Sequence, residues 1–459
     1  MLNFYLKREL AVMQQSPARW GSLVLFAVLS VWALMGGLRW QAETERVLDA
    51  TPADLLTDRA SWFAELDKVE AGEEVSPYAA RPVSLTTLAI QRPGELAALA
   101  FRDEAMDPRS TMINGWRSEA SLFRRYEVQG PSALQVGRLD MAFVVTVLLP
   151  LFLLILAFDV ISSERDAGRY PLFLVQGGNP LWLLLARLLV VAVPLLLVVA
   201  ACVITAAVVT GASIASTLLW LAIVFAYSLF WMGVTACIAV WVKRPVAGAM
   251  AVLATWALIV VLIPSASQFT AQAMHPLPSR VSFLSEARDA EGQSRRNVEK
   301  RAEVYMAEHP GQSNAGDDAV PGFYRSAYLA NLDINERVKP IVQRLEAQQA
   351  AQRGFVNRIA YASPAILVKS GLQALSGTGV ERSAAFRRQA RDYLGELLSR
   401  IGPATVSKSR LTREEALAIG EFEFVAPRLT SRWLPGLIWT LVLAVILLGI
   451  AGRRAANTP

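Results

Sequence analysis

A cluster of charged side chains follows directly on a long apolar run near the middle of the chain. It consists of Glu164, Arg165, Asp166 and Arg169, with Gly168 among them. A preceding serine is placed to cap a short helix, acidic groups are favourable near its N-terminus, and the glycine is suited to end it. An apolar patch follows at 170–176. A short helix with both charge signs and an adjoining apolar face suits docking into a cleft of another protein. The alternative is a solvated loop.

One further charge, Arg187, lies inside an apolar run. We expect it to be either a residue whose guanidinium snorkels to the membrane surface or a basic residue at a helix end. No apolar run carries a carboxylate at its centre, because Asp140 and Asp159 lie at the two ends of one run. Ion-driven pumps need ionisable groups at membrane depth. The energy for any uphill transport would therefore enter elsewhere.

Motifs for catalysis or nucleotide binding are missing from the sequence. It has no G-x-x-x-x-G-K-[ST] loop, no G-x-S-x-G elbow and no H-E-x-x-H pair. The two cysteines, Cys202 and Cys237, lie in apolar runs, and the two histidines, His275 and His309, form no metal-ligand pattern with them. We therefore expect no catalytic residue, metal or cofactor in this chain, and any ATP to be bound by a partner.

The apolar residues, which make up 54% of the 459-residue chain, are concentrated in blocks long enough to span a bilayer as helices. We predict six transmembrane helices at 20–38, 139–159, 183–209, 217–241, 246–264 and 433–451. The first is interpreted as an uncleaved anchor, because no small-residue cleavage site follows it. Pro150 and Pro194 lie inside spans, where a kink is the simple interpretation and a hinge the alternative.

Basic residues near the span ends predict the topology. They form four clusters, at Lys7, Arg8 and Arg19, at Arg165 and Arg169, at Lys243 and Arg244, and at Arg453 and Arg454. With six spans all four fall on one side, which the positive-inside rule assigns to the cytoplasm together with both termini. The net charge of +6 is thereby explained without a nucleic-acid partner.

The segments between the spans then fall on two sides. We predict a cytoplasmic interfacial helix at 1–19, extracytoplasmic segments at 39–138 and 265–432, a cytoplasmic coupling helix and turn at 160–182, and a cytoplasmic tail at 452–459. Apolar residues at helical spacing, such as Val338, Ile341, Val342 and Leu345, predict that the second segment is a helix-rich domain. Whether the first segment completes this domain is left open by the sequence. The stretch 308–322 is rich in turn formers and is expected to be a loop.

The N-terminal segment is expected to lie in the membrane interface and to contact lipid. Its apolar stripe consists of Leu2, Tyr5, Leu6, Leu10 and Met13, whereas Lys7, Arg8 and Glu9 are assigned to the polar side. The alternative is a frayed cytoplasmic tail.

The passage from Gly137 to Leu189 resembles the ABC-2 type transporter permeases. In that family a cytoplasmic helix with an E-R-x-x-G-T-L-like motif follows the second span, and Glu164, Arg165 and Gly168 match it. Arg169 and Tyr170 stand where Thr-Leu is usual, and Arg187 falls where the family places a basic residue. The resemblance implies that this helix contacts a cytoplasmic ABC ATPase.

A second passage is similar to the subgroup of these permeases with two large extracytoplasmic insertions. The residues that carry this match are Ser363, Pro364, Ala365, Leu375, Gly377, Thr378 and Phe386. Together the two resemblances imply a multi-pass subunit of the bacterial inner membrane, which pairs with a second copy or a sister permease and exports a small molecule, peptide or lipid.

Two other classes of function stay open on the residues alone. A membrane receptor or scaffold would suit the large extracytoplasmic segments, although only short loops and tails are predicted in the cytoplasm. A membrane-embedded hydrolase would need an acid/base pair or an activated nucleophile inside a span, and the sequence shows none.

Overall fold

The protein is a helical membrane protein with a second, helix-rich part outside the spans. The computed structural model describes residues 2–101, 109–122, 139–176, 178–277, 280–296, 298–308, 321–427 and 433–456. Within them, six helices are long and apolar enough to cross a membrane. They run over Pro17–Ala50, Met141–Asp166, Pro180–Thr210, Ile214–Trp241, Pro245–Met274 and Trp433–Ala455. The predicted fold class, with six spans, is confirmed.

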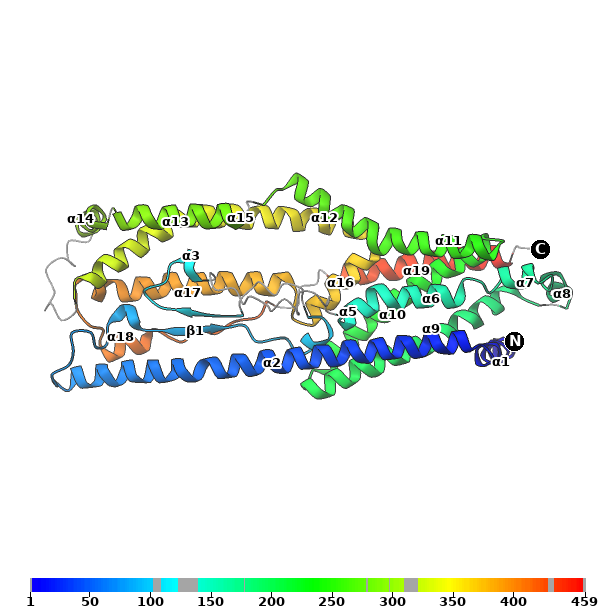
Figure 1. Cartoon of the computed structure of the whole chain (residues 1–459), viewed down its shortest axis with the longest axis horizontal. Helices are drawn as coiled ribbons and strands as arrows, with labels where there is room; N and C mark the ends of the chain where they lie inside the picture. The colour runs from blue at the N-terminus through cyan, green and yellow to red at the C-terminus, as the bar shows by residue number, and fades with distance from the viewer. Residues whose placement is uncertain are drawn as a thin grey trace.

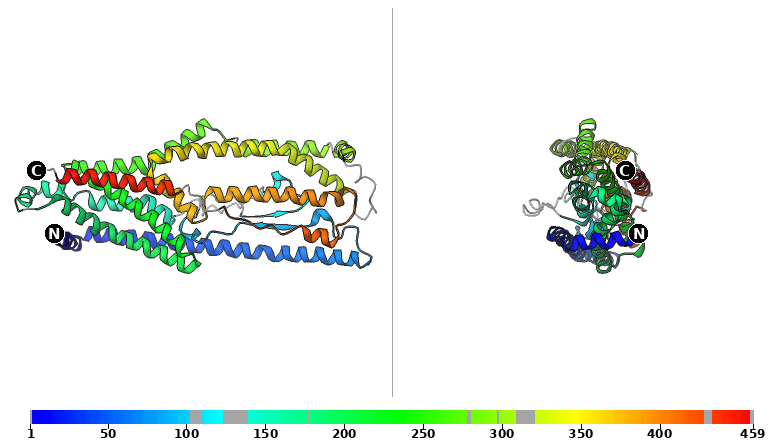
Figure 2. Two further views of the ribbon diagram at one scale, coloured as in Figure 1. Left: turned by 180° about the vertical axis from the view of Figure 1, so that it is seen from behind. Right: turned by 90° about the vertical axis from the view of Figure 1, so that its right-hand side faces the viewer.

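The molecule is elongated, with the spans in one half and the strands and helices of a separate domain in the other, and α2 extends through both (Figure 1). Helix α1 (Leu2–Gln14), helices α7 (Ser162–Asp166) and α8 (Tyr170–Val175), and the end of α19 (Trp433–Ala456) lie at the far end of the spans. Both termini therefore lie at the same end, opposite the domain (Figure 2).

The first span belongs to a helix that is much longer than expected. Helix α2 runs from Pro17 to Glu70 without a break at residue 38, where the sequence analysis ended the span. A helix of 54 residues is about 80 Å long. It continues because residues beyond the membrane find a second core: Trp62 and Leu66, one turn apart, are 5% and 1% exposed.

The domain outside the spans combines residues of both segments between them. Its core joins Trp62 and Leu66 of α2 to α15 (Phe323–Ile359), α17 (Val380–Val406) and α18 (Arg413–Ala418). The strands β1 (Thr87–Ile90) and β2 (Ser110–Ile113) pair antiparallel, with Thr87 opposite Ile113. Among the described residues, four further helices complete it: η1 (Pro82–Ser84), α3 (Glu119–Leu122), α13 (Arg280–Arg296) and α14 (Val298–Glu308). Helix η2 (Ala97–Leu99) instead packs on α2, and its Leu99 belongs to the core of the membrane-spanning half. Most of the predicted loop at 308–322 lies outside the described residues.

The second and fifth spans each contain a π-helical segment. The second span consists of α5 (Met141–Phe143), the π-helix η3 (Val144–Leu148) and α6 (Leu149–Ala157). The fifth consists of α11 (Pro245–Trp256), the π-helix η4 (Ala257–Leu262) and α12 (Ile263–Met274). The third and fourth, α9 (Pro180–Thr210) and α10 (Ile214–Trp241), are uninterrupted α-helices, although α9 contains Pro194.

A short helix connects the domain to the membrane-spanning half beside the fourth and sixth spans. Helix α15 ends in η6 (Ala360–Ala362), and α16 (Pro364–Leu375) then packs against α10 and α19. Its buried residues Ala365, Val368 and Leu372 belong to the core of the membrane-spanning half. Helix α16 therefore connects the domain to the spans by packing directly against them.

Candidate functional site

The charged cluster predicted from the sequence lies at the end of the bundle, in α7 and the turn to α8. Glu164, Arg165 and Asp166 are in α7. Gly168 has a φ of +68°, a left-handed conformation that favours glycine, and it turns the chain into α8. The predicted helix and its glycine stop are both present, although Ser162 and Ser163 lie within α7 and provide no side-chain cap.

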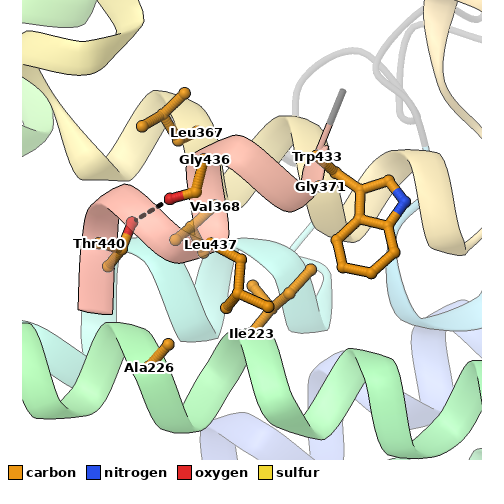
Figure 3. Close-up of a pocket in the computed structure, with 9 residues that line it drawn as sticks. All are labelled: Ile223, Ala226, Leu367, Val368, Gly371, Trp433, Gly436, Leu437 and Thr440. Carbon is orange, nitrogen blue, oxygen red and sulfur yellow. Dashed lines mark hydrogen bonds between the residues drawn. The ribbon is translucent and has the colours of Figure 1, made fainter. Parts of the chain in front are cut away.

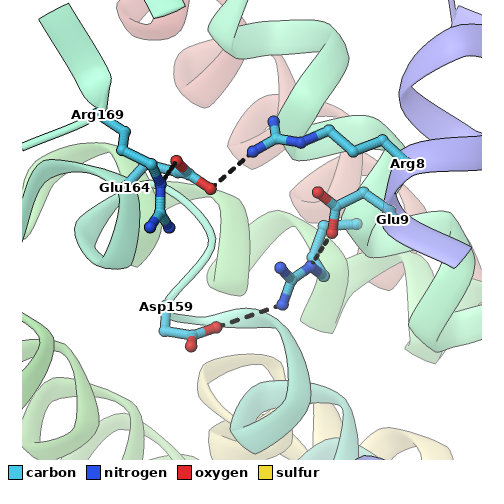
Figure 4. Close-up of polar contacts among 6 residues, drawn as sticks. Arg8, Glu9, Asp159, Glu164 and Arg169 are labelled. Atoms are coloured by element: carbon cyan, nitrogen blue, oxygen red, sulfur yellow. Dashed lines mark hydrogen bonds and ion pairs between the residues drawn. The ribbon is translucent and has the colours of Figure 1, made fainter. Parts of the chain in front are cut away.

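The carboxylate of Glu164 is bonded to other residues of the same chain. Its carboxylate accepts hydrogen bonds from Arg8 of α1 at 2.8 Å and from Arg169 at 3.0 Å (Figure 4). Its side chain is only 15% exposed. The hydrogen bond to Glu164 raises the pKa of Arg169 above its ordinary value. Glu164 thus joins α7 to the N-terminal helix and to the start of α8.

Arg165 lies against an aromatic ring instead of facing outward. Its guanidinium carbon is 4.7 Å from the centroid of the Tyr170 ring, within the range of a cation–π contact. Tyr170 itself is buried. Of the predicted docking residues, Glu164 and Arg165 therefore shape the turn from α7 to α8.

The outward surface of this turn is made by other side chains, which we call the tip face. The tip face consists of Asp166, Gly168, Arg169, Leu172 and Val175. Leu172 and Val175 are 59% and 85% exposed, and the side chain of Arg169 is 63% exposed. Two apolar side chains thus stand beside an acidic and a basic one at the end of the bundle.

Arg187 does not snorkel to the surface, so the snorkelling alternative was wrong. It is 6% exposed and forms an ion pair with Glu9, which is 2% exposed. A second carboxylate, that of Asp159, lies 3.5 Å from the other side of the guanidinium and 4.0 Å from Arg19 of α2. Removing two charges from water is costly unless they are paired, so Arg187 is held inside the protein by its partner on α1.

Glu9 was assigned to the polar side of the N-terminal helix, and this was also wrong. The buried face of α1 consists of Tyr5, Glu9 and Met13, which are spaced by one turn each. Leu10, assigned to the apolar stripe, is 46% exposed. The signal was available: an acidic residue four positions from each of two apolar residues lies on their face, and Arg187 was the one unmatched base in an apolar run.

A further hydrogen bond fastens α1 to the start of the third span. The backbone N–H of Asn179 donates to the Tyr5 hydroxyl at 3.0 Å. The side chain of Asn179 caps α9 by accepting from the N–H of Leu181 at 2.9 Å. Helix α1 thus contacts α7, α8 and α9 through Arg8, Tyr5 and Glu9, and it is an ordered part of the bundle.

The residues that carry the second resemblance lie where the domain meets the spans. Ser363 is fully buried and its hydroxyl donates to the carbonyl of Ile259 at 2.6 Å. Gly377 has a φ of +68°, and a Cβ there would lie 2.8 Å from the Cα of Gly94. The hydroxyl of Thr378 donates to the carbonyl of Ala100, and Phe386 is in the domain core. These contacts join α16 and α17 to the segment before β2.

A small pocket lies in the membrane-spanning half (Figure 3). It lies among α10, α16 and α19, where Ile223, Gly371 and Trp433 line it. The hydroxyl of Thr440 in its wall donates to Gly436 in its own helix at 2.8 Å. No charged group lines this pocket.

Among the described residues, no group of histidine, cysteine, aspartate and glutamate side chains is arranged to hold a metal ion. Cys202 and Cys237 are free thiols. A family model described as a domain of unknown function (DUF3526) matches residues 280–425, which include α13 to α18. No curated protein and no solved structure matches the chain. The match covers the larger part of the domain and none of the six spans, so it bears on the domain alone.

Proposed function

We propose that the chain is the permease subunit of an ABC-2 type transporter of the bacterial inner membrane. Both termini and the tip face would lie in the cytoplasm, and the domain would lie outside. A separate cytoplasmic ABC ATPase would bind ATP and dock on the tip face. A second copy or a sister permease would complete the pathway, and the cargo would be a small molecule, a peptide or a lipid.

The observation that carries this proposal is the exposure of the tip face. Apolar side chains that are 59% and 85% exposed at the outermost turn of the bundle have no partner within the described part of the chain. Charged residues of both signs flank them, as in the polar rim that surrounds the apolar centre of a protein interface. An ATPase cleft with complementary charges fits this surface.

The contacts behind the tip face would transmit a displacement of this surface to the spans. Arg169 is bonded to Glu164, Glu164 to Arg8, and the next residue, Glu9, to Arg187 of the third span. A displacement of α7 and α8 by an ATPase would therefore move α1 and α9 together. Since the chain carries no P-loop motif of its own, a contact of this kind is how ATP energy would enter.

The proposal is tested by replacing an exposed residue of the tip face that makes no internal hydrogen bond. We expect the Val175→Glu variant to insert normally into the membrane. The amount of ATPase that co-purifies with it in detergent should fall at least about tenfold. The ATPase to be recovered would be a P-loop protein encoded by a neighbouring gene. Lys243→Glu, an exposed charge in the other short loop on this side, is the matched control and should retain recovery.

Recovery of the ATPase with Val175→Glu at the wild-type level would contradict docking at this surface. A neighbouring gene for a histidine kinase, with recovery of that kinase instead of an ATPase, would favour the membrane receptor. Glu164→Lys is less informative, because it would break the bonds to Arg8 and Arg169 as well as alter any contact with a partner.

A further inference from the structure

The two π-helical segments have the same construction. In η3 the N–H of Leu149 bonds to the carbonyl of Val144, five residues back, and Pro150 follows. In η4 the N–H of Ile263 bonds to the carbonyl of Leu258, also five residues back, and Pro264 follows. Proline has no N–H, so the next carbonyl in each ladder loses its backbone partner. Unpaired carbonyls are costly inside a membrane.

Side chains from other elements supply donors to carbonyls of both segments, and in η4 the carbonyl served is the one that proline leaves without a backbone partner. The hydroxyl of Ser363 donates to Ile259 at 2.6 Å, and Ile259 is the carbonyl that lies five residues before Pro264. The hydroxyl of Tyr227 donates to Thr146 at 3.0 Å, four residues before Pro150. Ser363 and Tyr227 are both fully buried, so water does not compete for these bonds.

The two segments also contact each other. The indole N–H of Trp256, the last residue of α11, donates to the carbonyl of Val147 in η3 at 3.1 Å. Helix α16 packs against both η3 and η4. The irregular turns of the second and fifth spans therefore meet at one place, beside the short helix that seats the domain.

The fifth span changes its neighbours at this place. Before η4, helix α11 packs on α6 and α7, the latter next to the tip face. After η4, helix α12 packs on α15 of the domain. Only 11% of the most apolar stretch of this span is buried inside the protein, so few other contacts hold its two halves in one line.

We propose that η3 and η4 form a joint at which α12 swings relative to the other spans, and that the Ser363 hydroxyl is the latch that holds it closed. A π-helical turn has weaker internal bonding than an α-helix and is often found where function needs it. A hydrogen bond from a side chain is lost without unfolding the helix whose carbonyl it satisfies. The joint is independent of the transport function proposed above, and its test uses the full chain alone in detergent micelles.

Distances between pairs of spin labels would measure the swing. In a background with Cys202 and Cys237 replaced by alanine, one pair is placed beyond the joint, at Phe269 of α12 and Leu218 of α10. A reference pair is placed before it, at Met250 of α11 and Trp241 of α10. All four labelled side chains are at least half exposed, at 74%, 59%, 68% and 50%, so the labels themselves disturb little packing.

We expect Ser363→Ala to raise the population with a second distance in the Phe269–Leu218 pair about fivefold, the factor that one ordinary hydrogen bond contributes. The Met250–Trp241 pair should keep its distance, which also shows that the variant is folded. Ser363→Thr, which retains the hydroxyl, should behave as the unsubstituted chain. Ser370→Ala is the control, because that hydroxyl bonds only to carbonyls of its own helix, at Ile366 and Leu367.

Pro264→Ala provides the decisive background. It restores a backbone N–H that can take the Ile259 carbonyl, so Ser363→Ala should then leave the Phe269–Leu218 distances unchanged. Such non-additivity is expected only when two groups serve the same partner. An unchanged distribution with Ser363→Ala in the native background would overturn the latch. An equal shift with and without Pro264 would also overturn it, because the hydroxyl would then act elsewhere.

Discussion

The two ends of the membrane-spanning half are fastened by different kinds of contact. At the tip, α1 is joined to α7 and α9 by ion pairs that involve Arg8, Glu9 and Arg187. At the domain end, backbones pack closely: a Cβ on Gly37 of α2 would overlap the carbonyl oxygen of Ala98. Ion pairs fail when one partner is lost, whereas close backbone contacts fail when an atom is added. Substitutions of opposite kinds therefore break the two ends.

The largest effect is expected at the buried ion pair of the tip. Glu9→Ala leaves Arg187 buried without its main counter-charge, which costs about 3–5 kcal/mol when one partner of such a pair is removed. Thermal unfolding in detergent, followed by tryptophan fluorescence, would measure the loss. The double substitution Glu9→Leu with Arg187→Met removes both charges and should recover most of it. A double variant less stable than Glu9→Ala alone would show that the pair is not what holds α1.

An intermediate effect is expected at the domain end. Gly37→Ala adds a methyl group against the backbone of η2, which also donates the Ala98 N–H to Gln41 at 2.9 Å. Overpacking of this kind costs about 1–3 kcal/mol. Gly36→Ala is the matched control in the same helix, because a Cβ there meets nothing within 4 Å. Equal unfolding temperatures for the two variants would mean that η2 shifts to accommodate the methyl group without loss of stability.

The smallest effect is expected for Arg8. Its ion pair with Glu164 is partly exposed, with side chains 34% and 15% accessible, and exposed pairs contribute about 0–1 kcal/mol. Arg8→Ala should therefore lower the unfolding temperature slightly, and less at high salt because salt screens exposed charges. A loss as large as that of Glu9→Ala would reverse the order of the two contacts and make Glu164 the main fastening of α1.

Much of the fold follows from the sequence because apolar blocks of about 20 residues have one stable arrangement in a bilayer. The length of α2 beyond residue 38 did not, since it depends on a core that Trp62 and Leu66 share with α15 and α17. Nor did the pairing of Glu9 with Arg187, which are 178 positions apart. Their sequence neighbours mark each as unusual, but only the packing of α1 on α9 makes them partners.

The sequence predicted where the docking surface lies, but it identified only some of the residues that form this surface. Glu164 and Gly168 are in the expected short helix and its turn, yet the carboxylate is taken up by Arg8. The exposed Leu172 and Val175 belong to the apolar patch at 170–176, which was expected to suit docking although neither residue was named as part of the site. The π-helical turns could have been suspected from the repeated V-L-L-P at 147–150 and V-L-I-P at 261–264, although the donors to them come from distant elements.

The most direct test of the central claim is to identify what touches Val175 in the cell. A photo-crosslinking amino acid at this position, 85% exposed at the tip face, would be activated in intact cells, and the adduct identified by mass spectrometry. Docking of a separate ATPase predicts one main adduct, with a P-loop ATPase, that is lost when Leu172→Glu is added at the exposed neighbouring position. An adduct with lipid alone, or with a signalling protein, would contradict the proposal that this surface receives the energy for transport.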